Sequence, residues 1–69
     1  MPFNIRLREI RKKSGLNQQT MADNLFIALR TYQKYEQGVR EPSYSILIKM
    51  AIYLNTTVDN LLCIDEYRP

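Results

Sequence analysis

Residues 16–38 read LNQQTMADNLFIALRTYQKYEQG, and this stretch decides the fold. Over residues 18–25 the apolar side chains recur at helical spacing, and Asn17 is placed to cap the first turn. Residues 26–28 then separate this segment from a second periodic segment, which stops at Gly38. The stretch therefore predicts two short helices joined by a three-residue turn.

The second helix of this pair has two unlike faces. With 100° of rotation per residue, Tyr32 and Tyr35 mark its inner side. The outer side is long, polar and cationic, and it carries Leu29, Arg30, Gln33, Lys34 and Gln37. A short helix with such a face fits the major groove of B-DNA, which is about 12 Å wide, so that its outer side chains meet the base edges.

Three more helical segments flank this pair. The first covers residues 4–14, with Asn4 as its expected N-cap. Another covers residues 44–54 after Pro42-Ser43, and a short fifth helix follows Thr57. No strand alternation or internal repeat interrupts these segments, so we expect an all-α fold of five short helices.

The segment 44–54 is apolar on nearly every side. Its expected inward stripe consists of Tyr44, Leu47, Ile48, Ala51 and Leu54. Three further apolar residues lie outside that stripe, namely Ile46, Ile52 and Tyr53. Because an exposed apolar helix face is unfavourable in water, we expect a second partner to cover it.

Composition excludes several classes of function. The 69 residues suit one domain over 1–69, with the helix pair at about 18–37, the fourth and fifth helices within 43–64 and a tail at 65–69. The chain lacks histidine, and Cys63 is its one cysteine. It therefore lacks the side chains for an intrachain disulfide, for the usual general bases and for the usual zinc ligand sets. We expect no enzyme activity, cofactor or metal site, and a buried structural thiol.

Charge is unevenly distributed along the chain. Residues 1–40 hold eight basic and three acidic side chains, net +5, whereas residues 41–69 hold two basic and four acidic ones, net −2. A basic half suits a surface that faces a polyanion. No apolar run approaches the ~18 residues that span a bilayer, so we expect a cytoplasmic protein without a membrane partner.

Several motifs occur together in the order of a known family. The run LNQQTMA at 16–22 is followed by Leu25, by YEQG at 35–38 and by Pro42-Ser43. This combination resembles the Cro/C1-type (Xre-like) helix-turn-helix regulators over roughly residues 5–62. The resemblance implies a lambda-repressor-like fold and double-stranded DNA as the ligand.

The resemblance also implies roles for single residues. Gln18 is expected to touch a DNA phosphate and to brace the second helix of the pair, while Asn17 and Arg40 contact phosphates that set the register. Arg30 can bond guanine in a bidentate way, Gln33 can read adenine, and Lys34 can reach guanine or a phosphate. The expected DNA-binding set is Asn17, Gln18, Ala28, Leu29, Arg30, Thr31, Gln33, Lys34 and Arg40.

Family members carry a structural ion pair at the positions of Arg11 and Glu36, which here would brace the first helix against the third. A glutamate in the last turn of a helix opposes the helix dipole, so a cationic partner is expected for it. Leu29 stands where a polar residue is usual. Exposed, it serves either as a contact for a thymine methyl group or as part of a protein-binding patch.

Two other positions depart from the family pattern. Phe26 replaces the usual glycine of the turn, and a left-handed backbone there costs roughly 1–2 kcal/mol, so either the turn differs or packing of Phe26 offsets the strain. Ala28 replaces the usual Ser or Thr cap of the second helix, which forgoes about 1 kcal/mol.

These features together predict a sequence-specific transcriptional regulator, a homodimeric repressor that reads a palindromic operator with the helix 28–37. No small-molecule ligand is expected. The dimer interface is expected at Ile46, Ile52, Tyr53, Leu61, Leu62 and Ile64. The alternative is a protein-interaction module on the same fold, such as an antitoxin or anti-repressor partner, whose working surface is Leu29 and the fourth helix.

Overall fold

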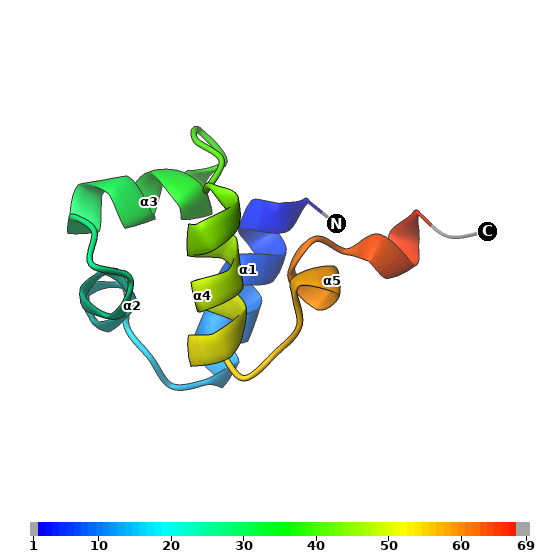
Figure 1. The fold of residues 1–69 in the computed structure, drawn as a ribbon, viewed down its shortest axis with the longest axis horizontal. Helices are drawn as coiled ribbons and strands as arrows, with labels where there is room; N and C mark the ends of the chain where they lie inside the picture. The colour runs from blue at the N-terminus through cyan, green and yellow to red at the C-terminus, as the bar shows by residue number, and fades with distance from the viewer. Residues whose placement is uncertain (1, 68–69) are drawn as a thin grey trace.

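The computed structural model describes residues 2–67, which form five α-helices and one turn of 3₁₀ helix (Figure 1). The elements are α1 Phe3–Lys13, α2 Gln18–Leu25, α3 Leu29–Gln37, α4 Tyr44–Tyr53, α5 Val58–Leu61 and η1 Ile64–Glu66. The described part of the chain contains no strand. The all-α fold class expected from the sequence is confirmed.

Local capping chemistry sets the starts of α2, α4 and α5 and the end of α3. The Asn17 side-chain oxygen accepts a hydrogen bond from the backbone N–H of Thr20 at 2.7 Å, and Ser43 and Thr57 cap α4 and α5 in the same way. Gly38 ends α3 with φ at 76°, in the left-handed region that favours glycine. These boundaries agree with the sequence prediction.

The start of α1 differs from the prediction. Its N-cap is Pro2, which offers no capping side chain, and the helix begins at Phe3. Asn4 lies inside the helix, where its side-chain amide donates a hydrogen bond to the backbone carbonyl oxygen of Glu36 at 3.3 Å. The prediction of Asn4 as N-cap was wrong, because this side chain joins α1 to the end of α3 instead.

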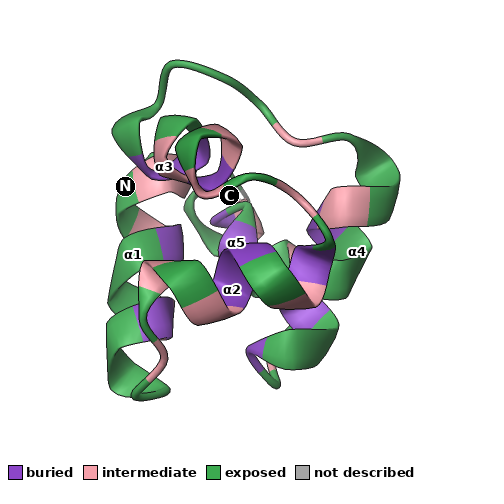
Figure 2. Ribbon diagram, turned by 90° about the vertical axis from the view of Figure 1, so that its left-hand side faces the viewer, coloured by how far each residue is buried: buried purple, intermediate pink, exposed green. Residues whose placement is uncertain are grey.

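The helices surround one core. In Figure 1, α3 lies across the top of the molecule with α2 seen nearly end-on below it, and α4 runs in front of α1. Figure 2 shows that the buried sectors of the helices face one another. The core consists of Leu7, Met21, Ala22, Leu25, Tyr32, Tyr35, Leu47, Met50, Ala51, Leu54 and Leu61.

The buried face of α4 is rotated relative to the predicted one. Leu47, Met50 and Ala51 are buried, whereas Tyr44 and Ile48, both expected to point inward, are 88% and 52% exposed. A helix that is apolar on nearly every side has no polar face to define its orientation, so packing against α2 and α5 decides it.

The turn between α2 and α3 contains a left-handed residue that is not glycine. Phe26 has φ 56° and ψ 42°, and the residue is 86% exposed. Neither expected explanation applies, because the turn is left-handed and the ring does not pack into the core. The Lys49 ammonium lies 6.0 Å from the ring centroid, a contact worth about 0.5–1 kcal/mol at an exposed site.

The C-terminal segment is held against α1. Arg6 Nη1 donates to the Asn60 carbonyl oxygen at 3.0 Å and to its side-chain oxygen at 2.7 Å, and Arg6 Nη2 lies 3.4 Å from a Glu66 carboxylate oxygen. The predicted tail 65–69 therefore begins with a helical turn, η1, while its residues 68–69 lie outside the described range. The thiol of Cys63 is buried, as predicted, and burial raises its pKa.

Candidate nucleic-acid interface

One side of α3 is fixed firmly to the body of the protein. Tyr32, Tyr35 and Glu36 are buried, and the two tyrosine rings meet edge to face with their centroids 6.5 Å apart. Burial raises the pKa of the Tyr32 hydroxyl, and the neighbouring Glu36 carboxylate raises it further. The inner side of α3 is thus packed into the core of the protein.

The opposite side of α3 faces solvent. Arg30, Lys34 and Gln37 are exposed, and none of the three side chains forms a hydrogen bond or ion pair with any residue between 2 and 67. The cations and the amide on this face are available to an external ligand.

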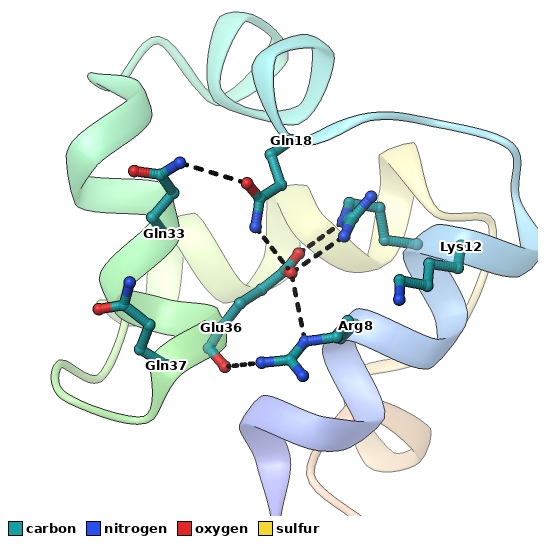
Figure 3. Close-up of a pocket in the computed structure, with 7 residues that line it drawn as sticks. Arg8, Lys12, Gln18, Gln33, Glu36 and Gln37 are labelled. Atoms are coloured by element: carbon teal, nitrogen blue, oxygen red, sulfur yellow. Dashed lines mark hydrogen bonds and ion pairs between the residues drawn. The ribbon is translucent and has the colours of Figure 1, made fainter.

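A buried polar network lies under the end of α3 (Figure 3). Arg11 Nε donates to Glu36 Oε2 at 2.6 Å, and Arg11 Nη2 donates to Glu36 Oε1 at 3.1 Å, which is a bidentate ion pair. Gln18 Nε2 donates to the same Oε1 at 3.1 Å. The ion pair of Arg11 and Glu36 therefore joins α1 to α3, and the hydrogen bond from Gln18 connects α2 to the same carboxylate.

The network sets the charge state of its members. Burial alone would raise the pKa of the Glu36 carboxyl, but the hydrogen bonds from Arg11 and Gln18 and the nearby Tyr32 hydroxyl outweigh burial and hold that pKa below its usual range. The hydrogen bond to Glu36 raises the pKa of Arg11. The pair is therefore fully charged at neutral pH.

Gln33 takes part in the same network. Its Nε2 donates to the Gln18 side-chain oxygen at 3.3 Å, and the side chain is half-buried. The chain of bonds from Gln33 through Gln18 to Glu36 links the middle of α3 to the N-terminus of α2. Gln33, predicted as a base reader, thus lies at the edge of the outer face, with its amide nitrogen turned towards α2 (Figure 3).

The remaining predicted DNA contacts lie within α3, at the N-caps of α2 and α3, and in the loop after α3. Asn17 and Ala28 are exposed at the N-caps of α2 and α3, and Ala28 makes no side-chain cap, as expected from its chemistry. Arg40 is exposed in the loop after α3, and Thr31 is half-buried. Leu29 is half-buried and packs against the core, so the expectation that it is exposed was wrong.

The residues predicted for a dimer interface are placed unevenly. Ile52, Tyr53 and Leu62 are exposed, whereas Ile46 and Ile64 are half-buried. Leu61 is completely buried among the core residues, so the structure contradicts its prediction as an interface residue. The exposed apolar stripe of α4 instead consists of Tyr44, Ile48 and Ile52, spaced four residues apart.

With this geometry in place, comparison with known proteins identifies the family. A model of the helix-turn-helix family matches residues 7–61. This chain is a helix-turn-helix protein. The resemblance to Xre-like regulators found in the sequence is thereby confirmed.

Relatives of this helix-turn-helix protein carry consistent names. The chain is 43% identical over 60 residues to "Uncharacterized HTH-type transcriptional regulator YqaE" and 47% identical over 57 residues to "HTH-type transcriptional regulator AnsR", both of Bacillus subtilis (strain 168). These matches cover 87% and 83% of this chain but 52% and 49% of the relatives. The chain thus spans about half the length of these curated relatives.

A solved structure has the same fold. The restriction-modification controller protein C.AhdI from Aeromonas hydrophila superimposes with a TM-score of 0.79 and 32% sequence identity. The match covers 86% of this chain and 89% of the controller protein. The arrangement of α1 to α5 is therefore that of a known helix-turn-helix structure.

Three polar residues of the helix-turn-helix protein escaped the sequence prediction of the site. A hollow of about 510 Å³ opens between α1, α2 and α3 above the Glu36 carboxylate, and Arg8, Lys12 and Gln37 line it beside the network residues (Figure 3). Gln37 shares the outer face of α3, so helical periodicity could have added it to the site. Arg8 and Lys12 stand four residues apart on α1, but that spacing does not show that they lie beside α3.

Other kinds of site find less support. Within residues 2–67 no three His, Cys, Asp or Glu side chains lie close enough together to hold a metal ion. No helix in that range has the length and apolar character needed to cross a membrane. The polar surface around α3 is the candidate functional site.

Proposed function

We propose that this chain binds duplex DNA by placing the outer face of α3 in the major groove, and that it acts there as a transcriptional regulator. The observation that carries the proposal is the contrast within α3. Its inner side is held by a buried ion pair, while Arg30, Lys34 and Gln37 face solvent unpaired within the described chain. The regulator names of the relatives support the same function.

The side-chain chemistry assigns a role to each contact. The Arg30 guanidinium can donate two hydrogen bonds to guanine O6 and N7, and Lys34 reaches a guanine or a phosphate one turn later. Asn17 uses its side-chain oxygen to cap α2, which leaves its amide nitrogen for a phosphate. Gln18 combines a phosphate contact with its bonds to Glu36 and Gln33.

Titration with duplex DNA tests this proposal. Fluorescence anisotropy with a labelled random-sequence duplex, repeated at several salt concentrations, should give an affinity that falls as salt rises. Selection of bound sequences should then yield a preferred site. Arg30→Ala with Lys34→Ala should abolish preference for that site, while Lys13→Ala with Lys49→Ala, which removes the same charge elsewhere, should preserve it.

Absence of duplex binding near physiological salt would contradict the proposal. In that case the exposed apolar stripe of α4 favours the alternative, a protein-interaction module of the antitoxin or anti-repressor kind. Its partner would bind the Arg30→Ala, Lys34→Ala variant and the unmodified protein equally well.

We also propose a homodimer formed through α4. Tyr44, Ile48 and Ile52 are 88%, 52% and 69% exposed, and Leu62, the residue after α5, lines the same pocket as Tyr44 and extends this surface. Two copies joined by a two-fold axis would set their α3 helices about 34 Å apart, which matches half-sites one DNA turn apart in a palindromic operator. A dimer on such a site would repress by occupying it.

Sedimentation equilibrium tests the dimer. The unmodified chain should associate to twice its monomer mass, and Ile48→Lys with Ile52→Lys should give monomers of unchanged helix content. That variant should lose more affinity for a palindrome than for a single half-site. A dimer that persists in the variant would show that another surface forms the interface.

A further inference from the structure

The hollow above Glu36 carries more positive charge than the Glu36 carboxylate neutralises. Arg11 is neutralised by Glu36 at 2.6 Å, whereas Arg8 and Lys12 line the same hollow. Arg8 Nε lies 3.8 Å from a Glu36 oxygen that Arg11 and Gln18 already bond. Three cations against one carboxylate leave the hollow with a net charge of +2.

The two surplus cations are open to solvent. Arg8 uses Nη2 to donate to the Glu36 carbonyl oxygen at 3.1 Å, and 46% of its side chain remains exposed. Lys12 is exposed and forms no hydrogen bond or ion pair with the described residues. One cation is therefore held in place by α3, and the other is free to move towards a ligand.

Neutral donors complete the lining. Gln37 on α3 and Gln18 at the start of α2 border the same hollow, so donors from three helices surround one space (Figure 3). The N–H groups at the N-terminus of α2 add partial positive charge beside Gln18. Cationic and neutral donors that converge from several elements are suited to an oxyanion with several acceptor oxygens.

We propose that this hollow binds one phosphodiester group of the DNA backbone, with Arg8 and Lys12 as its cationic contacts and Gln37 as a neutral donor. The inference rests on the proposed function, because Gln33 and Gln37 at the rim belong to α3 and a duplex read by α3 must pass over the hollow. The contact would extend the footprint onto α1. It would fix the register of α3 without reading sequence.

Lys12→Gln and Lys13→Gln form a matched pair for the test. Both lysines are exposed on α1 and differ in that only Lys12 lines the hollow. Lys12→Gln should lower the affinity of the full chain for DNA about three- to tenfold. The factor should be the same for a random duplex and for a selected site, because a phosphate contact is independent of sequence. The slope of log affinity against log salt should become shallower by about 0.9.

The control variant Lys13→Gln and a second variant, Arg8→Gln, test whether the effect is specific to the hollow. Lys13→Gln should change the affinity and the slope by less than half as much. Arg8→Gln, checked first for an unchanged melting temperature, should repeat the Lys12→Gln result. If Lys12→Gln and Lys13→Gln behave alike while the unmodified chain still binds DNA, the hollow is not a phosphate site and the proposed function stands.

Two further outcomes overturn the inference differently. No duplex binding by the unmodified chain would remove both the proposed function and this contact. The same phosphate chemistry also exists in free anions, so inorganic phosphate is titrated into ¹⁵N-labelled protein and followed by NMR. Saturable shifts of the Gln18 and Gln37 side-chain amides at submillimolar phosphate, together with an unchanged DNA affinity in Lys12→Gln, would assign the hollow to a small anion instead of DNA.

Discussion

α3 and α4 are successive helices of nearly equal length with opposite distributions of polarity. α3 buries a carboxylate, Glu36, and exposes the cations Arg30 and Lys34. The buried side chains of α4 are all apolar, and α4 also exposes further apolar side chains, including Ile48 and Ile52. A helix held by a paired charge and presenting cations suits a polyanion, and a helix apolar on both sides suits a protein surface. Adjacent helices of one small domain can thus serve two ligands of different chemistry.

Loss of the Glu36 carboxylate should affect stability most. Glu36→Ala leaves the Arg11 guanidinium buried without a counter-ion, and breaking a buried pair in this way costs about 3–5 kcal/mol. A domain of this size has about that much stability in total. We expect the variant to be largely unfolded at 25 °C by circular dichroism.

The double variant Arg11→Met with Glu36→Met is the control for that experiment. Replacing both partners by apolar groups removes the unpaired charge, so this variant should be markedly more stable than Glu36→Ala in urea unfolding. Equal stabilities of the single and double variants would show that the position of α3 does not depend on charge pairing.

The two sides of α4 should respond very differently to truncation. Met50 is completely buried and Ile52 is 69% exposed. Met50→Ala should lower the free energy of unfolding by about 2–4 kcal/mol through the cavity it creates. Ile52→Ala should change it by less than about 0.5 kcal/mol at concentrations where the chain is monomeric. Similar losses for both would contradict the orientation of α4.

Acid should weaken the fixed side of α3. The folded-state pKa of Glu36 lies below its unfolded value, so its contribution to stability is fully present above the unfolded pKa and is lost as pH falls through the folded one. NMR titration of the Glu36 carboxyl carbon should give a midpoint below the value of about 4.3 for an unperturbed glutamate. A midpoint at or above that value would mean that burial outweighs the hydrogen bonds.

A small effect is expected from glycine in the turn between α2 and α3. Phe26→Gly removes left-handed strain of roughly 1–2 kcal/mol together with the Lys49 contact and some chain stiffness. These contributions oppose one another, so the fold should be kept and the free energy of unfolding should change by no more than about 1 kcal/mol in urea denaturation. A larger loss would show that the exposed ring stabilises the turn by contacts not evident in the monomer.

The sequence predicted those parts of the fold that depend on neighbouring residues. Asn17 and Gly38 set helix ends through bonds within a few positions, so their roles were readable from local spacing. Asn4 was misassigned because its partner, Glu36, is 32 residues away. The partners of the ion pair, Arg11 and Glu36, are also far apart in sequence, at 25 residues. This pair was predicted from the family resemblance and not from any local pattern.

The site shows the same division. The cations Arg30 and Lys34 follow from helical periodicity, and the structure leaves both exposed. The hydrogen bond from Gln33 to Gln18, and the contribution of α1 to the hollow, depend on how helices cross, which no periodicity encodes. The prediction of which face of α4 is buried failed for a related reason. The sequence of α4 has no polar face that would fix the rotation of the helix about its axis.

The one-sided attachment of α3 has a consequence for evolution. The side chains of Arg30, Lys34 and Gln37 form no hydrogen bond or ion pair within residues 2–67, so exchanging them breaks no internal polar interaction. Substitutions at such exposed positions usually change stability by less than about 0.5 kcal/mol. Under the proposed function, substitutions of Arg30 and Lys34 can therefore change the preferred DNA target, while the buried pair of Arg11 and Glu36 holds α3 in the same position.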